Sequence, residues 1–291
     1  MFNVALIGAN GMLGRELAGL LRARGIVFVG LDLPELDITS PPSLADCDEL
    51  QKAEIIFNCA AYTNVEKAEV EEELATAING AGVRNLARLA KDNGAYLLHI
   101  STDFVFDGNS ARPYLPDDQP APLSAYGRSK LAGEIALAET GGTWAILRTA
   151  WLYGIHGRNF VETMLSLAEK NGRLDVVDDQ TGSPTMTLDL AGVMLSLAEK
   201  KATGVYHCVN AGTTTWCGFA REIVKQAGLD VPVYPLTAAQ ASEKFNLKAV
   251  RPAYSVLDCG GLENVTHGKM RDWHEALVDY LSRRETAKHG N

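Results

Sequence analysis

The sequence predicts an α/β protein with a doubly wound parallel sheet and a smaller, discontinuous α/β lobe. Two observations predict the sheet. Short apolar segments alternate with helical patterns, as parallel strands joined by right-handed crossovers require; they lie at 3–7, 26–31, 55–59, 96–100 and 145–149. The segments 55–59 and 96–100 are almost continuously apolar, which is typical of strands covered on both faces.

A glycine-rich turn follows the first segment and opens a helix. Gly8, Gly11 and Gly14 form a GxxGxxG pattern. Such a turn presents free backbone N–H groups and the positive end of a helix dipole, where a pyrophosphate can bind. The pattern is weak alone, but its place after the first strand favours a Rossmann-like dinucleotide-binding domain.

The second segment ends at Asp32, eighteen positions after Gly14. An acid here is placed to bind the adenosine ribose hydroxyls and would repel a 2′-phosphate, so we expect NADH to serve at least as well as NADPH. Arg15, just past the turn, would soften that preference. The alternative interpretation is an ordinary turn aspartate before Pro34.

The chain beyond residue 154 alternates less regularly. We expect helices at 159–170, 185–200, 215–227 and 272–283, with strands at 173–178 and 204–209. The predicted dinucleotide-binding domain comprises 1–154 and 183–211, and the predicted substrate lobe comprises 155–182 and 212–291. The acidic run at 69–73 is interpreted as a solvated helix start.

Composition excludes several classes of function. A net charge of −9 without a basic cluster argues against nucleic acid as a partner. No segment is long and apolar enough to predict a membrane span, and no secretion signal is evident, so we expect a cytoplasmic protein. Five cysteines without a CxxC pair predict reduced thiols rather than disulfides or zinc. Phosphate-loop, HExxH and GxSxG motifs are absent, and His99 is interpreted as a packed strand residue.

Tyr126 and Lys130 are candidates for chemistry beside a dinucleotide. Four positions apart in the helical pattern 125–137, they project from one helix face. We expect the lysine cation to lower the phenol pKa and to bind the nicotinamide ribose. The alternative is an amphipathic helix pair without a catalytic role. A hydroxyl of Ser101 or Thr102, at the end of the fourth strand, could hold a substrate carbonyl oxygen.

Several stretches together resemble the extended short-chain dehydrogenase/reductases over nearly the whole chain. They lie at 58–69, 101–108, 122–134, 148–154, 159–160 and 176–185. The resemblance implies NADH or NADPH as cofactor and a dTDP-linked 4-keto-6-deoxy sugar as substrate. The implied reaction reduces the C4 ketone of dTDP-4-dehydro-L-rhamnose to dTDP-L-rhamnose.

The resemblance also implies residue roles. Thr102 and Tyr126 contact the keto group, Tyr126 donates the proton, and Lys130 assists it. Asp103 and Trp151 contact the sugar, although Trp151 could equally cap the core. The residues implied to line the cofactor, with the neighbouring Ala60, are Gly8, Met12, Leu13, Asp37, Ile38, Ala61 and Thr63.

Three departures from the family pattern, Glu66, Phe104 and Pro116, could change the sugar accepted. Two alternatives therefore stay open: a reductase of another nucleotide-linked 4-keto-6-deoxy sugar, and a non-catalytic relative resembling the regulatory subunit of methionine adenosyltransferase. A homodimer is left open, and so is Mg²⁺, which no pattern in the sequence supports.

Overall fold

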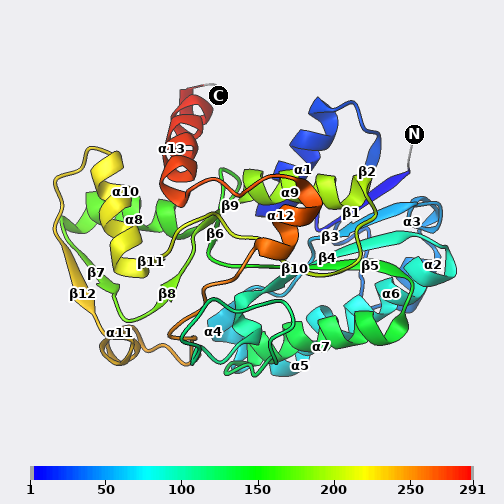
Figure 1. Cartoon of the computed structure of the whole chain (residues 1–291), viewed down its shortest axis with the longest axis horizontal. Helices are drawn as coiled ribbons and strands as arrows, with labels where there is room; N and C mark the ends of the chain where they lie inside the picture. Colours follow the sequence, from blue (N-terminus) through cyan, green and yellow to red (C-terminus); the bar gives the residue numbers. More distant parts are fainter. Residues whose placement is uncertain (1–2, 290–291) are drawn as a thin grey trace.

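The computed structural model describes residues 3–289 and confirms the α/β class. Six parallel strands form the central sheet in the order β10-β5-β4-β3-β1-β2 (Figure 1). They are β1 (Val4–Ile7), β2 (Phe28–Leu31), β3 (Ile55–Asn58), β4 (Tyr96–Thr102), β5 (Thr143–Thr149) and β10 (Gly204–His207). The chain turns from β2 to the opposite side of β1 to form β3, so the strand order reverses between β1 and β3. Ligands bind beside such a reversal.

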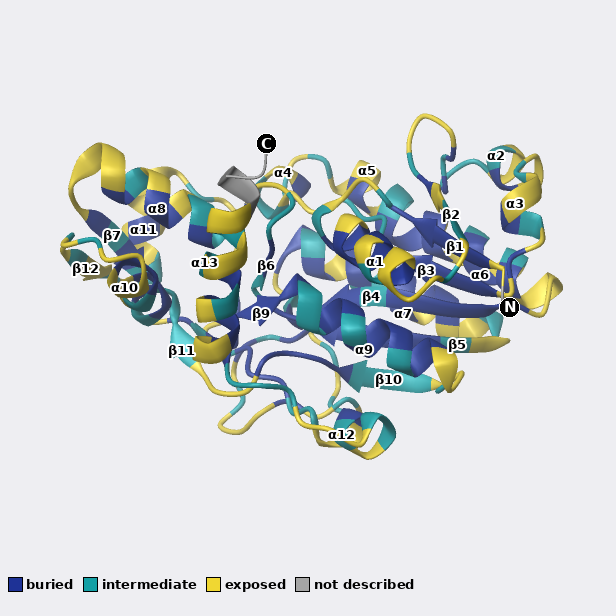
Figure 2. Ribbon diagram, turned by 90° about the horizontal axis from the view of Figure 1, so that it is seen from above, coloured by how far each residue is buried: buried dark blue, intermediate teal, exposed yellow. Residues whose placement is uncertain are grey.

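Two apolar layers enclose the sheet. Successive residues of β1 face opposite sides, so Val4 and Leu6 join one core while Ala5 and Ile7 join the other. The first core includes residues of α1 (Met12–Ala23), α9 (Thr187–Glu199) and α12 (Gly260–Thr266), and the second includes residues of α6 (Val83–Asp92) and α7 (Ala125–Thr140). Figure 2 shows the inner strands buried between helices whose outer faces are exposed.

Short helices connect the strands of the first half. They are α2 (Pro41–Ala45), α3 (Asp48–Gln51), α4 (Val65–Ala68), α5 (Glu72–Thr76), a π-helix at Ala77–Gly82 and a 3₁₀ turn at Asp103–Val105. Apart from α5, the sequence pattern did not predict them. The acidic run does start a helix, α5, and it is solvated as predicted: Glu72 and Glu73 are exposed, and Glu69 and Glu71 are partly exposed. Glu69 accepts a hydrogen bond from the Ala125 N–H (2.8 Å), and Glu72 pairs with Arg128 (2.8 Å), so the run holds the start of α7.

A second group of elements surrounds an aromatic core made by Tyr153, Phe219, Trp273 and Tyr280. It comprises α8 (Phe160–Asn171), β7 (Leu174–Val177), α10 (Trp216–Gln226), β12 (Val233–Leu236), α11 (Ala238–Phe245) and α13 (Trp273–His289). Two short strand pairs adjoin it: β6 (Leu152–Tyr153) with β9 (Thr185–Met186), and β8 (Thr181–Gly182) with β11 (Thr214–Thr215). None of the helices within residues 3–289 is both long and apolar enough to cross a membrane.

The division into two lobes stays a prediction, and residues 1, 2, 290 and 291 of its boundaries lie outside the described residues. One segment of the predicted substrate lobe, α12, packs on the central sheet instead, because its Leu262 lies in the core beside α9.

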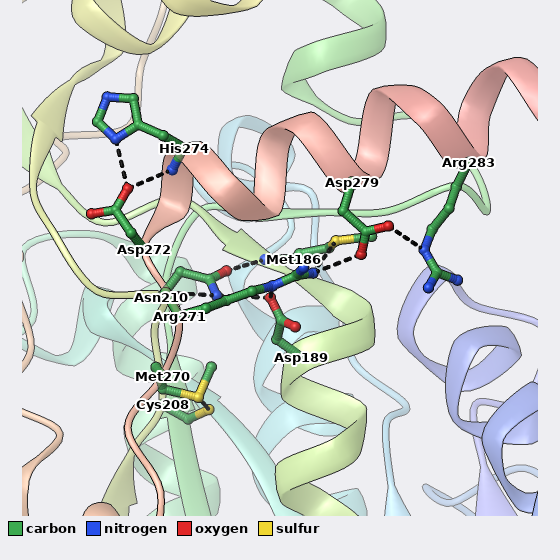
Figure 3. Close-up of polar contacts among 10 residues, drawn as sticks. All are labelled: Met186, Asp189, Cys208, Asn210, Met270, Arg271, Asp272, His274, Asp279 and Arg283. Carbon is green, nitrogen blue, oxygen red and sulfur yellow. Dashed lines mark hydrogen bonds and ion pairs between the residues drawn. The ribbon is translucent and has the colours of Figure 1, made fainter.

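Arg271 joins α13 to α9. Its guanidinium contacts Asp189 of α9 at 2.9 Å and Asp279 of α13 at 3.0 Å (Figure 3). Asn210 donates to the same Asp189 carboxylate (2.7 Å) and accepts from the Met186 N–H (2.8 Å). These contacts fix the C-terminal helix against the helix that precedes β10.

A buried ion pair gives a test of the packing between α7 and β5. Glu134 and Arg148 contact each other at 2.7 Å with side chains only 5% exposed. We expect Glu134→Ala to lower the free energy of unfolding by about 3 to 5 kcal/mol, because it leaves the guanidinium buried without its partner charge. Glu199→Ala, which removes an exposed pair with Arg24, is the control and should lower it by about 0 to 1 kcal/mol. Equal losses in denaturant unfolding would contradict the prediction.

Candidate active site

A cleft of about 820 Å³ lies at the carboxyl ends of the sheet strands. Every residue predicted from the sequence as a site residue lines it, although their individual roles stay predictions. They are Gly8, Gly11, Met12, Leu13, Gly14, Asp32, Asp37, Ile38, Ala60, Ala61, Thr63, Thr102, Asp103, Tyr126, Lys130 and Trp151.

The glycine turn forms one end of the cleft. Gly8 has a φ of +76°, and a Cβ there would lie 2.6 Å from the Ala60 nitrogen; a Cβ on Gly14 would lie 2.1 Å from the Gly8 oxygen. The first turn of α1 has neither a side-chain cap nor an acidic residue, so its N–H groups are available to an anion. The turn therefore fits a dinucleotide pyrophosphate.

Asp32 connects the glycine turn to the end of β2. Its carboxylate accepts hydrogen bonds from the Asn10 and Leu33 N–H groups, both at 2.9 Å. It thus has the local contacts of a turn aspartate and also lines the cleft, so both sequence interpretations describe part of its environment. Asp37 similarly accepts from Thr39, while Ile38 is buried close to Gly82.

Tyr126 lies at the start of α7, edge-on to Phe104 with ring centroids 5.5 Å apart. Burial raises the pKa of Tyr126 to about 12; the Thr102 hydroxyl opposes that rise, and the Asp103 carboxylate adds to it. The pKa of Tyr126 is thus raised where the sequence predicted a lowered value, because desolvation is the largest effect and Lys130 is not among its causes.

Lys130 is 2% exposed and reaches back toward β4. Its Nζ donates to the Ile100 carbonyl at 2.6 Å and lies 3.3 Å from Nε2 of His99. Burial lowers the pKa of Lys130 to about 8, although Glu134 and Cys59 act in the opposite direction. The lysine can therefore change its charge close to neutral pH.

Thr102 and Asp103 adjoin the phenol at the end of β4. The Thr102 hydroxyl donates to Asp103 Oδ1 at 3.0 Å. Burial raises the pKa of Asp103 to about 6, with part of the rise offset by the Ser255 and Thr102 hydroxyls. This carboxyl can hold a proton at mildly acidic pH. Its raised pKa indicates that the surroundings favour neutral groups.

Trp151 lies where the two groups of elements meet. Its φ is +48°, and its indole stacks on Trp216 of α10 with ring centroids 3.6 Å apart and an interplanar angle of 10°. The stack is a packing role, and Trp151 also lines the cleft. Both sequence interpretations of this residue therefore remain compatible with its position.

Sequence reasoning missed Thr149 and Arg158, which also line the cleft. Thr149 lies directly opposite Thr102 in the parallel register of β4 and β5, a pairing that only the sheet order reveals. Arg158 follows Gly157 in a loop after β6. The one feature of the sequence that could have pointed to it is a cationic side chain next to a turn glycine. Within residues 3–289, no group of three or more His, Cys, Asp or Glu side chains is arranged to hold a metal ion.

Comparisons with known proteins agree with this geometry. The family model described as RmlD substrate binding domain matches residues 2–286. The dTDP-4-dehydrorhamnose reductase of Streptomyces griseus is 42% identical, covering 94% of this chain and 90% of its own. The dTDP-4-keto-6-deoxy-D-glucose reductase of Streptomyces niveus is 40% identical, covering 93% of each. The solved dTDP-4-dehydrorhamnose reductase of Bacillus anthracis in complex with NADP is 37% identical with a TM-score of 0.92, covering 97% of this chain and 99% of that chain.

The glycine turn can be tested with two substitutions in one helix. Gly14→Ala should weaken NADH binding at least tenfold and destabilise the fold by about 1 to 3 kcal/mol, because the new Cβ overlaps the Gly8 carbonyl. Gly19→Ala, where a Cβ meets no atom within 4 Å, should leave NADH binding unchanged and stabilise α1 by up to about 1 kcal/mol. Fluorescence titration with NADH and denaturant unfolding measure both effects, and normal NADH binding by Gly14→Ala would refute the model of the turn.

Proposed function

Because the chain belongs to the RmlD substrate binding domain family, we propose that it is an NAD(P)H-dependent reductase that converts dTDP-4-dehydro-L-rhamnose to dTDP-L-rhamnose. The observation that carries the proposal is the convergence of Tyr126, Lys130 and Thr102 with the glycine turn around one cleft. The relatives named for this reaction match nearly the whole chain, which supports carrying the reaction over to it.

The proposed mechanism assigns proton donation to Tyr126. Bound NAD(P)H supplies the hydride for C4 of the ketosugar. As the C4 oxygen gains negative charge, the Tyr126 hydroxyl hydrogen-bonds it and gives it a proton. Because burial raises the pKa of this phenol to about 12, Tyr126 carries its proton throughout the neutral range and so has a proton to give.

Thr102 and Asp103 help to hold the substrate in this scheme. The Thr102 hydroxyl lies at the end of β4, where the C4 oxygen of the substrate would bind beside Tyr126. This hydroxyl donates a hydrogen bond to the Asp103 carboxylate. Trp151 offers an apolar ring surface that suits the face of a 6-deoxy sugar. We assign residues 155–182 and 212–291 to the lobe that binds the sugar nucleotide, with the exception of α12, whose Leu262 packs into the core beside α9.

The sugar is the finer part of the proposal. The Streptomyces niveus relative, named for a dTDP-4-keto-6-deoxy-D-glucose substrate, supports a second candidate in which a different 4-keto-6-deoxy sugar is reduced. The non-catalytic alternative is disfavoured because Tyr126, Lys130 and Thr102 all line the cleft.

Asp32 supports a preference for NADH, since its carboxylate would face a 2′-phosphate with like charge. Arg15 lines a smaller hollow beside Asn10 and would attract that phosphate, so NADPH is also a candidate cofactor. We further propose a cytoplasmic location, which the five free cysteines support. We also propose that the protein can form a homodimer. The contacts within residues 3–289 are all within one chain and do not bear on this proposal.

Tyr126→Phe tests the proposed reaction. Purified protein should oxidise NADH or NADPH, followed by nicotinamide absorbance, when given freshly prepared dTDP-4-dehydro-L-rhamnose. Tyr126→Phe should lower kcat by about 10² to 10⁴ while NADH affinity stays within about threefold, because only the transferable proton is lost. Wild-type activity in this variant would assign proton donation to another group, and no turnover by the wild type with any dTDP-linked 4-keto sugar would refute the proposed function.

Trp151→Ala tests the sugar-binding role against a packing role. Removing the indole should raise the KM for the sugar nucleotide by roughly tenfold, since it takes away one wall of the cleft. Trp216→Ala removes the same stack from a residue that does not line the cleft, so it controls for stability. If Trp151→Ala and Trp216→Ala change KM by the same factor and lower the melting temperature by the same amount, Trp151 has a packing role alone.

A further inference from the structure

Three buried side chains form a continuous line beneath the cleft. Asn58 of β3 and His99 of β4 are directly opposite in the parallel register, and both are fully buried. Asn58 Nδ2 lies 3.0 Å from His99 Nδ1, and His99 Nε2 lies 3.3 Å from Lys130 Nζ. The proposed mechanism does not use His99.

The backbone of Ala60 determines which proton each member of this line can carry. The Ala60 N–H is an obligatory donor, and Asn58 Oδ1 accepts it at 3.1 Å. The Asn58 NH₂ group must therefore face His99, whose Nδ1 accepts. A neutral imidazole that accepts at Nδ1 carries its proton on Nε2, so it presents a donor to Lys130.

An ammonium group cannot accept that donor, whereas a neutral amine can. The neutral amine of Lys130 can donate to the Ile100 carbonyl and accept from His99 at the same time. Protonation of the amine removes its lone pair, so that the Lys130 ammonium and the His99 Nε2–H are two donors facing each other. Uptake of a proton is therefore opposed by hydrogen-bond geometry, in addition to burial.

We propose that Asn58 and His99 are a positioning pair for Lys130. The pair disfavours proton uptake by the amine, and an anionic dinucleotide that enters the cleft opposes this effect. The proposal deepens the proposed function and rests on it for the identity of the dinucleotide. Binding of NADH then favours the ammonium form, and the proton comes from solvent. Above neutral pH, NADH binding should accordingly take up a proton.

The other titratable groups facing Lys130 do not supply this effect. Burial raises the pKa of the Cys59 thiol to about 12, so it is uncharged. Glu134, one turn further along α7, favours the ammonium form but is paired with Arg148. Tyr126, one turn earlier, is also neutral. Burial holds the pKa of His99 well below its usual range, and a charged Lys130 acts in the same direction, so the imidazole is neutral whichever form the lysine takes.

The direct test follows the lysine itself by NMR. Protein stripped of nucleotide and labelled with ¹³C and ¹⁵N in lysine is titrated, with Lys130→Met to assign the Lys130 signal. We expect Lys130 to titrate near pH 8 and its pKa to rise by about one unit in His99→Gln, whose amide can turn its oxygen to the ammonium, and in Asn58→Ala, which frees the histidine tautomer. Ser129→Ala removes a neighbouring buried hydroxyl on α7 that accepts from Asn79, and should leave the titration unchanged.

A Lys130 pKa near the ordinary value of about 10.4 in the wild type would overturn the proposal. So would variants that titrate like Ser129→Ala. If the variants do not fold, ¹⁵N-histidine spectra of the wild type above about pH 8, where Lys130 is neutral, decide the matter. The proposal requires His99 to carry its proton on Nε2 under these conditions, and an Nδ1–H tautomer refutes it.

NADH affinity as a function of pH provides a second readout that needs no sugar substrate. Wild-type Kd should increase up to tenfold per pH unit above about pH 8, and in His99→Gln the increase should begin about one unit higher. Identical profiles would refute the proposal. Failure of the proposed reaction appears separately, as normal NADH binding without turnover of the ketosugar.

Discussion

The parallel alignment of β3, β4 and β5 is the constraint on which the cleft depends. Strands that run in one direction end at one edge, so the residues after them gather there even though they are far apart in sequence. The same alignment places Asn58 opposite His99 and Thr102 opposite Thr149. The glycine turn completes this edge because Gly8, lacking a side chain, lies against the backbone of Ala60 at the end of β3.

Burial at this edge moves its ionisable groups toward their neutral forms. The pKa values of Tyr126 and Asp103 rise, while those of Lys130 and His99 fall, and desolvation is the largest cause in each case. Asp103 and Lys130, at the inner end of the cleft, therefore change charge closer to neutral pH than such groups ordinarily do. A dinucleotide and a sugar nucleotide bring the negative charge, and the protein meets it with backbone N–H groups, a helix dipole and a lysine that can gain a proton.

The alternation of apolar segments and the residues that follow each strand predicted the sheet and the cleft. The glycine turn, Asp32, Thr102 and Trp151 were found because strand ends are readable from local pattern. The connecting helices of four or five residues other than α5 were not found, since such segments span barely one turn and carry no periodic stripe. The start of α5 was found from its acidic run. The direction of the Tyr126 pKa and the contact of His99 with Lys130 depend on burial and strand register, which arise only when distant segments pack together.

The position of β10 at the sheet edge has a consequence for how the chain folds during synthesis. β10 pairs with β5, but residues 150–203 must be made before it appears. Until then, β5 presents an unpaired and strongly apolar edge at 145–147, the kind of edge that recruits strands from other chains. Because this contact joins segments far apart in sequence, closing the sheet is a late and slow event. Premature termination before β10 would therefore yield a chain prone to aggregate, even though five strands of the sheet are complete.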